Sequence, residues 1–154
     1  CAIEVRGALE GLAARRLAEA GVPPALLATL QRCLHDGDEV LAQGHLAEGD
    51  IARWSRLNKV FHDTIVGGTG SRVIADAIAR NNHLPFASAD SITIDPQAPD
   101  PEFRKLQFAQ LQHRLIVDAL RGRESARVET LMREHANIGL RYGALFGLET
   151  PLRA

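Results

Sequence analysis

The chain has 154 residues, and its formal net charge is −1 at pH 7. That length fits one domain with its own hydrophobic core, and the near-zero charge argues against nucleic-acid binding through a broad basic surface. Hydrophobic residues make up 45% of the chain but aromatic ones only 5%, so we expect an aliphatic core. No apolar stretch reaches the roughly 18 residues that a membrane-spanning helix requires, and no signal-peptide pattern opens the chain.

Two cysteines, Cys1 and Cys33, stand far apart and lack the CxxC spacing of a redox or metal motif. We interpret both thiols as reduced, which indicates a cytoplasmic protein. The chain starts at Cys1 without a methionine and shows helical periodicity from its first residues. We therefore expect that a preceding segment has been removed.

Apolar residues recur every three or four positions in six segments, which turn-forming residues separate. Gly21 ends the first segment and Pro23-Pro24 opens the second, which is the usual order of glycine after one helix and proline at the start of the next. Asp50 and Ser71 stand where they would cap the third and fourth helices. The predicted helices span residues 2–20, 24–43, 51–66, 72–82, 101–121 and 124–145.

No segment alternates apolar and polar residues over the length of a strand beside hairpin turns. The nearest candidate, residues 91–94, is short and isolated. The glycine cluster at residues 67–70 lacks the Lys-Ser/Thr of a phosphate-binding loop and follows no strand, so we interpret it as a loop that ends a helix. The sequence thus predicts an all-α fold, an antiparallel bundle of about six helices in a single domain over residues 1–154.

Three histidines lie in line with apolar residues of predicted helices. His62 follows Asn58 by four residues, so both lie on one face of the third helix. His113 and His135 fall on the apolar stripes of the fifth and sixth helices. One such imidazole is most simply a core residue with a single hydrogen bond. Three on separate helices indicate a metal site, because neutral imidazole is the commonest transition-metal ligand and bundle cores hold such sites.

The predicted topology allows these side chains to meet. A tight turn at Gly122 should pack the last two helices antiparallel, with His113 nine residues before it and His135 thirteen after it. The resulting offset of four residues is about 6 Å along the helices, which two imidazole side chains can absorb. Three imidazoles and the amide oxygen of Asn58 suit Zn(II), Ni(II), Co(II) or Mn(II), with zinc ranked first, and leave positions for an anionic ligand.

The chain resembles the effector-binding domain of GntR-type bacterial transcription regulators, in the FCD (FadR C-terminal domain) subfamily. Residues Glu4–Glu10, followed by Ala13–Ala18, look like that family's first helix. Leu57–His62 looks like its Asp-x3-His ligand pair. Gln112–Leu120, with Met132–His135, looks like its closing helical hairpin. The likeness spans nearly the whole chain.

Two positions depart from the family pattern. Asn58 stands where the family has aspartate, and Gln112 stands where glutamate is common. The resemblance implies a divalent ion at positions 58, 62, 113 and 135 that is completed by a small organic acid. It also implies a homodimer without enzymatic activity, which acts on N-terminal winged helix-turn-helix domains that bind DNA and are absent from this chain. We nominate Arg6 to bind the carboxylate of the effector, because a guanidinium can hold it bidentately; the alternative is an ordinary ion-pair or surface arginine.

Two other functions fit the same residues. A metalloenzyme could use the three histidines to activate water, but the chain has no HExxH motif, and Glu134, beside His135, points to a different helix face. A metal-free sensor of a larger apolar acid, such as an acyl thioester, would only pack the histidines in its core. Metal analysis separates the two sensor hypotheses, and a turnover screen on small esters and hydroxy acids tests the enzyme.

Overall fold

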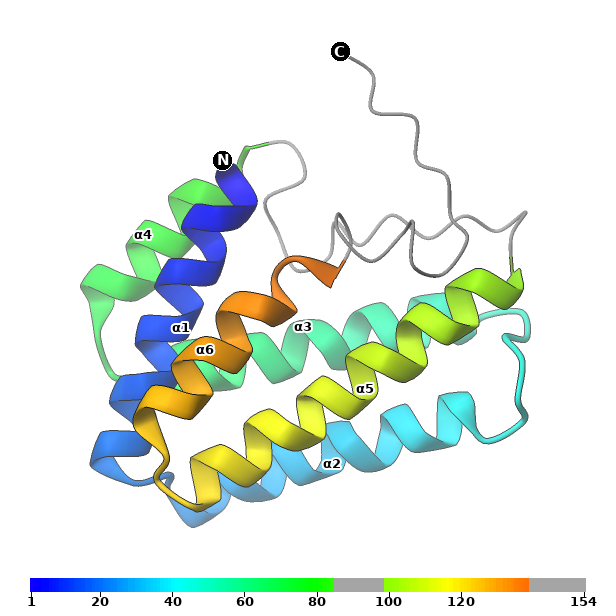
Figure 1. The fold of residues 1–154 in the computed structure, drawn as a ribbon, viewed down its shortest axis with the longest axis horizontal. Helices are drawn as coiled ribbons and strands as arrows, with labels where there is room; N and C mark the ends of the chain where they lie inside the picture. Colours follow the sequence, from blue (N-terminus) through cyan, green and yellow to red (C-terminus); the bar gives the residue numbers. More distant parts are fainter. Residues whose placement is uncertain (85–98, 139–154) are drawn as a thin grey trace.

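The computed structural model describes residues 1–84 and 99–138. Within these residues the fold is all-α, with six helices and no strand, which confirms the predicted fold class. Figure 1 shows the helices in chain order: α1 (Ala2–Ala20), α2 (Pro24–Leu41), α3 (Asp50–Gly68), α4 (Arg72–Asn82), α5 (Pro99–Arg121) and α6 (Ser125–His135).

Most helix ends follow the predicted local signals. Gly21 ends α1 with a φ of 88°, a backbone conformation that glycine adopts without strain. The Ser71 side chain accepts a hydrogen bond from the Ile74 N–H and so caps α4, as predicted. The predicted cap of α3 was wrong by one residue, because Gly49 is the N-cap. Asp50 is the first helical residue, and its carboxylate accepts the N–H of Ala47 at 2.8 Å.

The last helix is shorter than the predicted span of 124–145, because α6 ends at His135. The side chain of Asn137 donates to the Arg133 carbonyl at 3.2 Å, and its backbone N–H turns to the Glu134 carbonyl at 3.0 Å. The side chain therefore takes the carbonyl that a continuing helix would offer to the Asn137 N–H. The predicted remainder of this helix from residue 139 lies outside the described residues.

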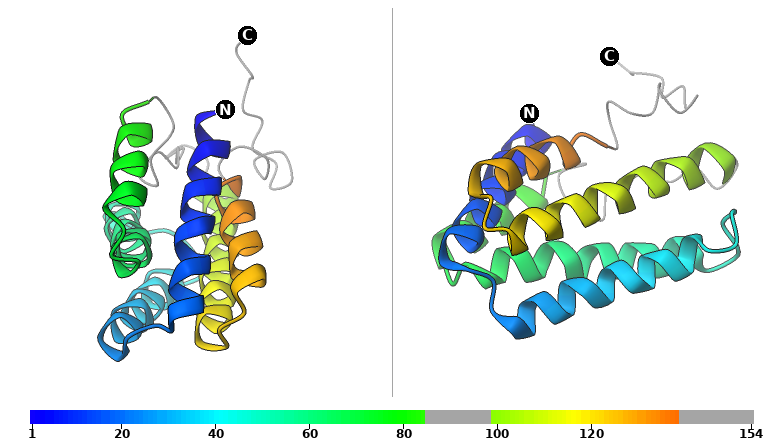
Figure 2. Two further views of the ribbon diagram at one scale, coloured as in Figure 1. Left: turned by 90° about the vertical axis from the view of Figure 1, so that its left-hand side faces the viewer. Right: turned by 60° about the horizontal axis from the view of Figure 1, so that its bottom comes forward.

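The helices form two groups that cross each other. Figure 2 shows α4, α1 and α6 side by side, and α1 packs against both of its neighbours. The helices α2, α3 and α5 form the second group, in which α2 contacts both α3 and α5. A tight turn at Gly122, whose N–H bonds the Asp118 carbonyl at 2.9 Å, folds α6 back along α5 as predicted. Helix α1 also contacts α3 and α5, so it joins the two groups.

The core is mainly aliphatic, as the composition predicts. Its larger cluster contains residues from all six helices, and a smaller cluster surrounds Trp54 near the N-terminal end of α3. Several polar and charged side chains are buried in the same interior, and six of them bear on function: Arg6, Glu10, Asn58, His62, His113 and His135.

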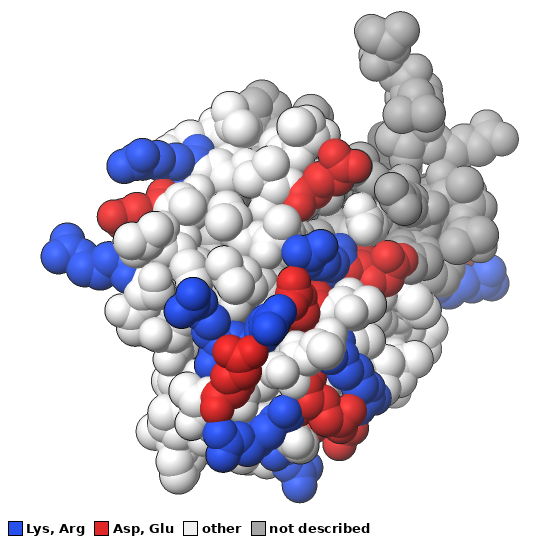
Figure 3. All heavy atoms as spheres, turned by 60° about the vertical axis from the view of Figure 1, so that its left-hand side comes forward, with Lys and Arg blue, Asp and Glu red and all other residues white. Residues whose placement is uncertain are grey.

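The surface carries both signs of charge. On the face seen in Figure 3, lysine and arginine side chains are interspersed with aspartate and glutamate. This mixture agrees with the net charge of −1 over the whole chain. Among residues 1–84 and 99–138, no helix combines the length and the apolar character needed to cross a membrane.

Helices α1 and α6 approach each other at two glycines of α1. A Cβ atom on Gly7 would lie 3.1 Å from the Cβ of Ala136, and one on Gly11 would lie 3.0 Å from the carbonyl oxygen of Glu129. Both distances are tight for non-bonded carbon, so the contact leaves almost no room for a side chain. The position of His135 on α6 therefore depends on these two small residues.

Replacing Gly11 by leucine is expected to destabilise the domain by about 1–3 kcal/mol, since overpacking forces the two helices apart. The better helix propensity of leucine offsets at most about 1 kcal/mol of this loss. Urea unfolding measures the change. The matched control is Ala8→Leu, three residues earlier on the exposed side of α1, where we expect a change within about 0.5 kcal/mol. Equal midpoints for the two variants would contradict the tight contact.

Candidate metal centre

The three histidines singled out by the sequence converge in the interior. His62 comes from α3, His113 from α5 and His135 from α6, and their donor nitrogens all lie within 4.8 Å of one another. Each of the three residues is buried, with at most 2% of its surface exposed. Since three helices distant in sequence supply them, the fold itself assembles the cluster.

His113 and His135 are in direct contact. Their Nε2 atoms are 3.1 Å apart, and Nδ1 of His135 lies 2.7 Å from Oε1 of Gln112. An amide oxygen only accepts, so Nδ1 of His135 carries the proton and its Nε2 carries the lone pair. In the metal-free protein His113 then donates its Nε2–H to His135. A ligating histidine is commonly fixed in this way, by an acceptor at its outer ring nitrogen.

His62 contacts a buried carboxylate. Its Nδ1 lies 3.1 Å from Oε2 of Glu10, and the same carboxylate oxygen lies 3.4 Å from Nε of Arg6. The alignment at this oxygen is poorer than that of a regular hydrogen bond. Burial by itself would raise the pKa of Glu10, but the His62 ring and the Arg6 guanidinium outweigh it and hold that pKa below its ordinary value.

Asn58 is also buried, one turn before His62 on the same helix. Its side chain therefore lies on the interior side of α3, where the sequence predicts the fourth ligand. A neutral oxygen is a weaker donor than the carboxylate of the family pattern. The burial of Asn58 and its position on α3 are consistent with a ligand, and Asn58 as a metal ligand stays a prediction.

Two aromatic rings enclose His113. Phe61 stacks on it with ring centroids 4.1 Å apart, and Trp54 lies parallel to it at 5.9 Å. Both rings are also fully buried core residues, as expected from their place on the apolar stripe. They shield His113 from water and restrict its rotation. A metal ligand held in this way needs little reordering on binding.

The donor set fits a divalent transition ion. Two nitrogens bound to one ion at about 2.1 Å lie about 3.0–3.4 Å apart in octahedral or tetrahedral geometry, and the Nε2 atoms of His113 and His135 are already 3.1 Å apart. Nε2 of His62 is buried and has no hydrogen-bond partner within residues 1–84 and 99–138. A buried polar atom without a partner is costly, and coordination would satisfy it.

Stability of the metal-free domain is expected to fall as the pH drops below about 6.5. Burial, with the nearby His62, holds the pKa of His113 well below its ordinary value, and burial with neighbouring cationic groups does the same for His135. On acidification these imidazoles therefore become protonated in the unfolded chain before they do so in the native state. The free energy of unfolding then falls by up to about 1.4 kcal/mol per pH unit for each imidazole.

Urea midpoints measured with chelator between pH 7.5 and 5.5 test this dependence. This pH range lies above 4.5, the ordinary pKa of a glutamate carboxyl group. A change in stability within it therefore reports on the histidines. An exposed histidine gives the control, and His45→Gln should leave the slope unchanged. A midpoint that does not vary with pH would show that the buried imidazoles are not held neutral.

A cavity of about 370 Å³ opens between α1, α3 and α4 and reaches the back of the cluster. Glu10 and His62 form its buried wall. The exposed ion pair of Lys59 and Asp63, with Nζ and Oδ2 2.7 Å apart, stands at its edge. Its other walls are largely apolar or small, so it suits a compact ligand with few polar groups.

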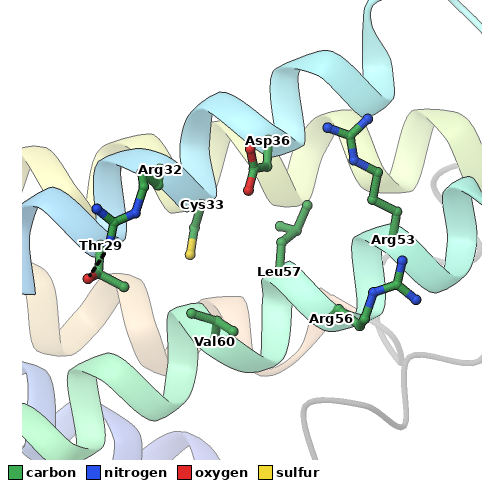
Figure 4. A pocket seen from close by; sticks show the side chains of 8 residues that line it. All are labelled: Thr29, Arg32, Cys33, Asp36, Arg53, Arg56, Leu57 and Val60. Atoms are coloured by element: carbon green, nitrogen blue, oxygen red, sulfur yellow. Dashed lines mark hydrogen bonds between the residues drawn. The ribbon is translucent and has the colours of Figure 1, made fainter.

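A second cavity, of about 320 Å³, lies between α2 and α3. Figure 4 shows Cys33 and Leu57 pointing into the gap between the two helices, with the side chains of Arg53 and Arg56 at one end. Its lining includes none of the three histidines. This cavity is therefore separate from the candidate metal centre.

Sequence reasoning found the histidines but missed two residues that contact them, Glu10 and Gln112, as partners. Glu10 stands three and four positions before Ala13 and Ala14, which are fully buried, so its register on α1 could have revealed it. Gln112 precedes His113 in sequence but contacts His135. That pairing depends on how α5 and α6 pack, and no local pattern encodes it.

The sequence model of the FCD domain matches residues 2–137. The chain therefore belongs to the FCD domain family, the effector-binding domain of GntR-family transcription regulators. This is a regulatory ligand-binding family and not a catalytic one. No curated protein matches the chain.

Proposed function

We propose that this domain senses a small organic acid through a divalent metal ion held by Asn58, His62, His113 and His135. One observation carries the proposal: three buried imidazoles from three helices converge within 4.8 Å. Membership of the FCD family makes the domain an effector sensor of a GntR-type regulator. The metal and the class of acid are the parts that we add.

The chemistry of the donors favours zinc, followed by nickel, cobalt and manganese. Imidazole suits all of these ions, and zinc readily takes three histidines with an open position. All four proposed ligands are neutral, so the ion keeps its full charge. When bound, it supplies a positive, coordinatively open point for a carboxylate in a site from which water is largely excluded.

Arg6 supports the choice of an acid as effector. This residue is only 4% exposed, and its side chain lies beside Glu10, which contacts His62. The contact with Glu10 uses Nε, and the terminal NH₂ groups of the guanidinium are the ones we assign to the effector. A buried cation near a metal site favours an anionic ligand over a neutral one.

The cavity between α1, α3 and α4 is the proposed approach to this region. At about 370 Å³ it lies near the small end of the range typical of ligand pockets, about 300–1,000 Å³. We therefore expect acids of three to six carbons and not a long acyl chain. Binding would act on operator DNA through N-terminal domains outside this chain, in a homodimer whose FCD unit is residues 1–154.

Thermal shift tests the proposal directly. A panel of three- to six-carbon organic acids is measured with Zn²⁺, with Ni²⁺ and with chelator, because a ligand that binds only the native state raises its stability by RT ln(1 + [L]/Kd). We expect stabilisation by at least one acid only when metal is present. Stabilisation of equal size with chelator would favour a metal-free sensor. Turnover of small esters or hydroxy acids would favour an enzyme.

Replacing Asn58 by aspartate is expected to have opposite effects in the two states. Without metal the variant buries a carboxylate, so the melting temperature should fall. With Zn²⁺ the carboxylate becomes a charged ligand, so metal affinity should rise above that of the wild type. Calorimetric titration and thermal shift measure both effects. Gln31→Glu, an added carboxylate on the exposed side of α2, is the control, and tighter zinc binding by that variant alone would contradict Asn58 as a ligand.

A further inference from the structure

A buried carboxylate lies directly behind the histidine cluster. Glu10 is 2% exposed, and its Oε2 lies 3.1 Å from Nδ1 of His62. Among the described residues Glu10 is not part of the group whose donor atoms converge, and its contact with that group is the one with His62. Burying a carboxylate costs several kcal/mol unless it is paired, and Arg6, one turn earlier on α1, supplies the partner.

We propose that Glu10 is a positioning residue of the metal centre, whose carboxylate accepts the Nδ1–H of His62 and so leaves the Nε2 lone pair for the ion. The inference rests on the proposed metal site. A neutral imidazole has one N–H and one lone pair, and the acceptor at one nitrogen decides where the lone pair lies. Nδ1 of His62 faces Oε2 of Glu10 at 3.1 Å without regular hydrogen-bond alignment, and Nε2 is buried with no hydrogen-bond partner among the described residues.

His135 shows the same arrangement with a different acceptor. Its Nδ1 faces Oε1 of Gln112 at 2.7 Å, while its Nε2 faces His113. Each of these two histidines thus has a side-chain oxygen facing its Nδ1, and the Nε2 of His135 faces the third histidine. The acceptors come from different helices, Glu10 from α1 and Gln112 from α5. The pattern is that of an outer shell that orients metal ligands.

Glu10 also places the negative charge that the ligands lack. Three imidazoles and the amide of Asn58 are all neutral, so no inner ligand offsets the charge of a divalent ion. The Glu10 carboxylate supplies one negative charge on the far side of the His62 ring from the proposed ion, and Arg6 holds the carboxylate in place. Polarisation through His62 makes that imidazole a stronger donor. Removing the carboxylate should therefore lower metal affinity although no ligand is removed.

Two variants of Glu10 separate its two effects. Glu10→Ala removes both acceptor and charge, whereas Glu10→Gln keeps an acceptor oxygen and removes the charge. The control is Glu19→Gln on the same helix, an exposed residue paired with Arg15. Zn²⁺ affinity is measured by competition with a chelator. The tautomer of His62 is read without metal, from ¹⁵N–¹H long-range correlations of the imidazole rings.

We expect His62 in the Nδ1–H form in the wild type and in Glu10→Gln. In Glu10→Ala the Nδ1–H form should lose its dominance, and zinc affinity should fall by about 10–100-fold, with a smaller loss for Glu10→Gln. Unchanged affinity in both variants relative to Glu19→Gln, or an unchanged tautomer in Glu10→Ala, would overturn the proposal.

Folding and metal binding are checked separately. Circular dichroism shows whether Glu10→Ala, which leaves Arg6 unpaired, still folds; if it does not, the affinity of Glu10→Gln decides, and a value equal to the Glu19→Gln control overturns the proposal. A wild type that binds no metal would refute the proposed function and with it the role of Glu10 at an ion. The metal-free tautomer would still show whether Glu10 orients His62.

Discussion

Replacing His135 by alanine is expected to abolish the metal-dependent rise in melting temperature and to reduce the bound metal to background. His135 contributes a nitrogen that lies 3.1 Å from that of His113, so its loss leaves two imidazoles and an amide for an ion that needs at least three good protein ligands. The apo protein should still fold, since His135 is replaced by a smaller residue at the end of α6. Metal content of purified protein and calorimetric titration with Zn²⁺ give the measurement.

The matched control is His35→Ala on α2. The His35 side chain is 73% exposed and lies in an ion-pair contact with Glu39, so its loss should change neither metal content nor stability beyond about 0.5 kcal/mol. Retention of one zinc ion per chain by His135→Ala, with wild-type affinity, would refute the site. A variant that loses metal but keeps its helical signal would establish the loss as local.

Replacing Phe61 by alanine is expected to destabilise the domain by about 3–5 kcal/mol, the usual result of truncating a buried phenylalanine. Phe61 is fully buried in the larger core cluster and stacks on His113 at 4.1 Å. Its removal opens a cavity beside a candidate ligand. Zinc affinity should therefore fall as well, because His113 gains rotational freedom that binding must remove. Urea unfolding and calorimetric titration measure the two effects.

Val60 provides the comparison one position earlier on α3. It is 45% exposed, so Val60→Ala should cost no more than about 0.5 kcal/mol. A loss for Phe61→Ala as small as that for Val60→Ala would contradict the packing described for α3. Full stability loss with unchanged zinc affinity would show that the aromatic ring supports the core without constraining His113.

The helices could be predicted because their signals are local. Gly21 and Ser71 act through their own backbone or nearest turn, and both positions end or begin a helix as expected. The end of α6 could not be predicted, because the pattern of apolar residues continues past His135. There the Asn137 side chain competes for a backbone carbonyl, and periodicity does not report such competition.

The candidate site was predictable in its residues but not in its surroundings. Helical register places His62, His113 and His135 on inward faces, and the hairpin at Gly122 limits how far apart the last two can be. The partners of these histidines depend instead on packing between helices. Glu10 contacts His62 where α1 packs against α3. The sequence around Glu10 does not indicate which helix will supply its partner.

The glycine contact between α1 and α6 has a mechanical consequence. At Gly7 and Gly11 the backbone of α1 lies against the backbone and the first side-chain atoms of α6. The contact leaves little room for relative movement, so we expect the two helices to move as one rigid body. Arg6 and Glu10 lie on α1 and His135 lies on α6, while α3 and α5 carry the other two histidines. If an acid binds at the proposed centre, we expect it to displace α3 and α5 relative to the α1–α6 pair as rigid bodies, without bending any one helix.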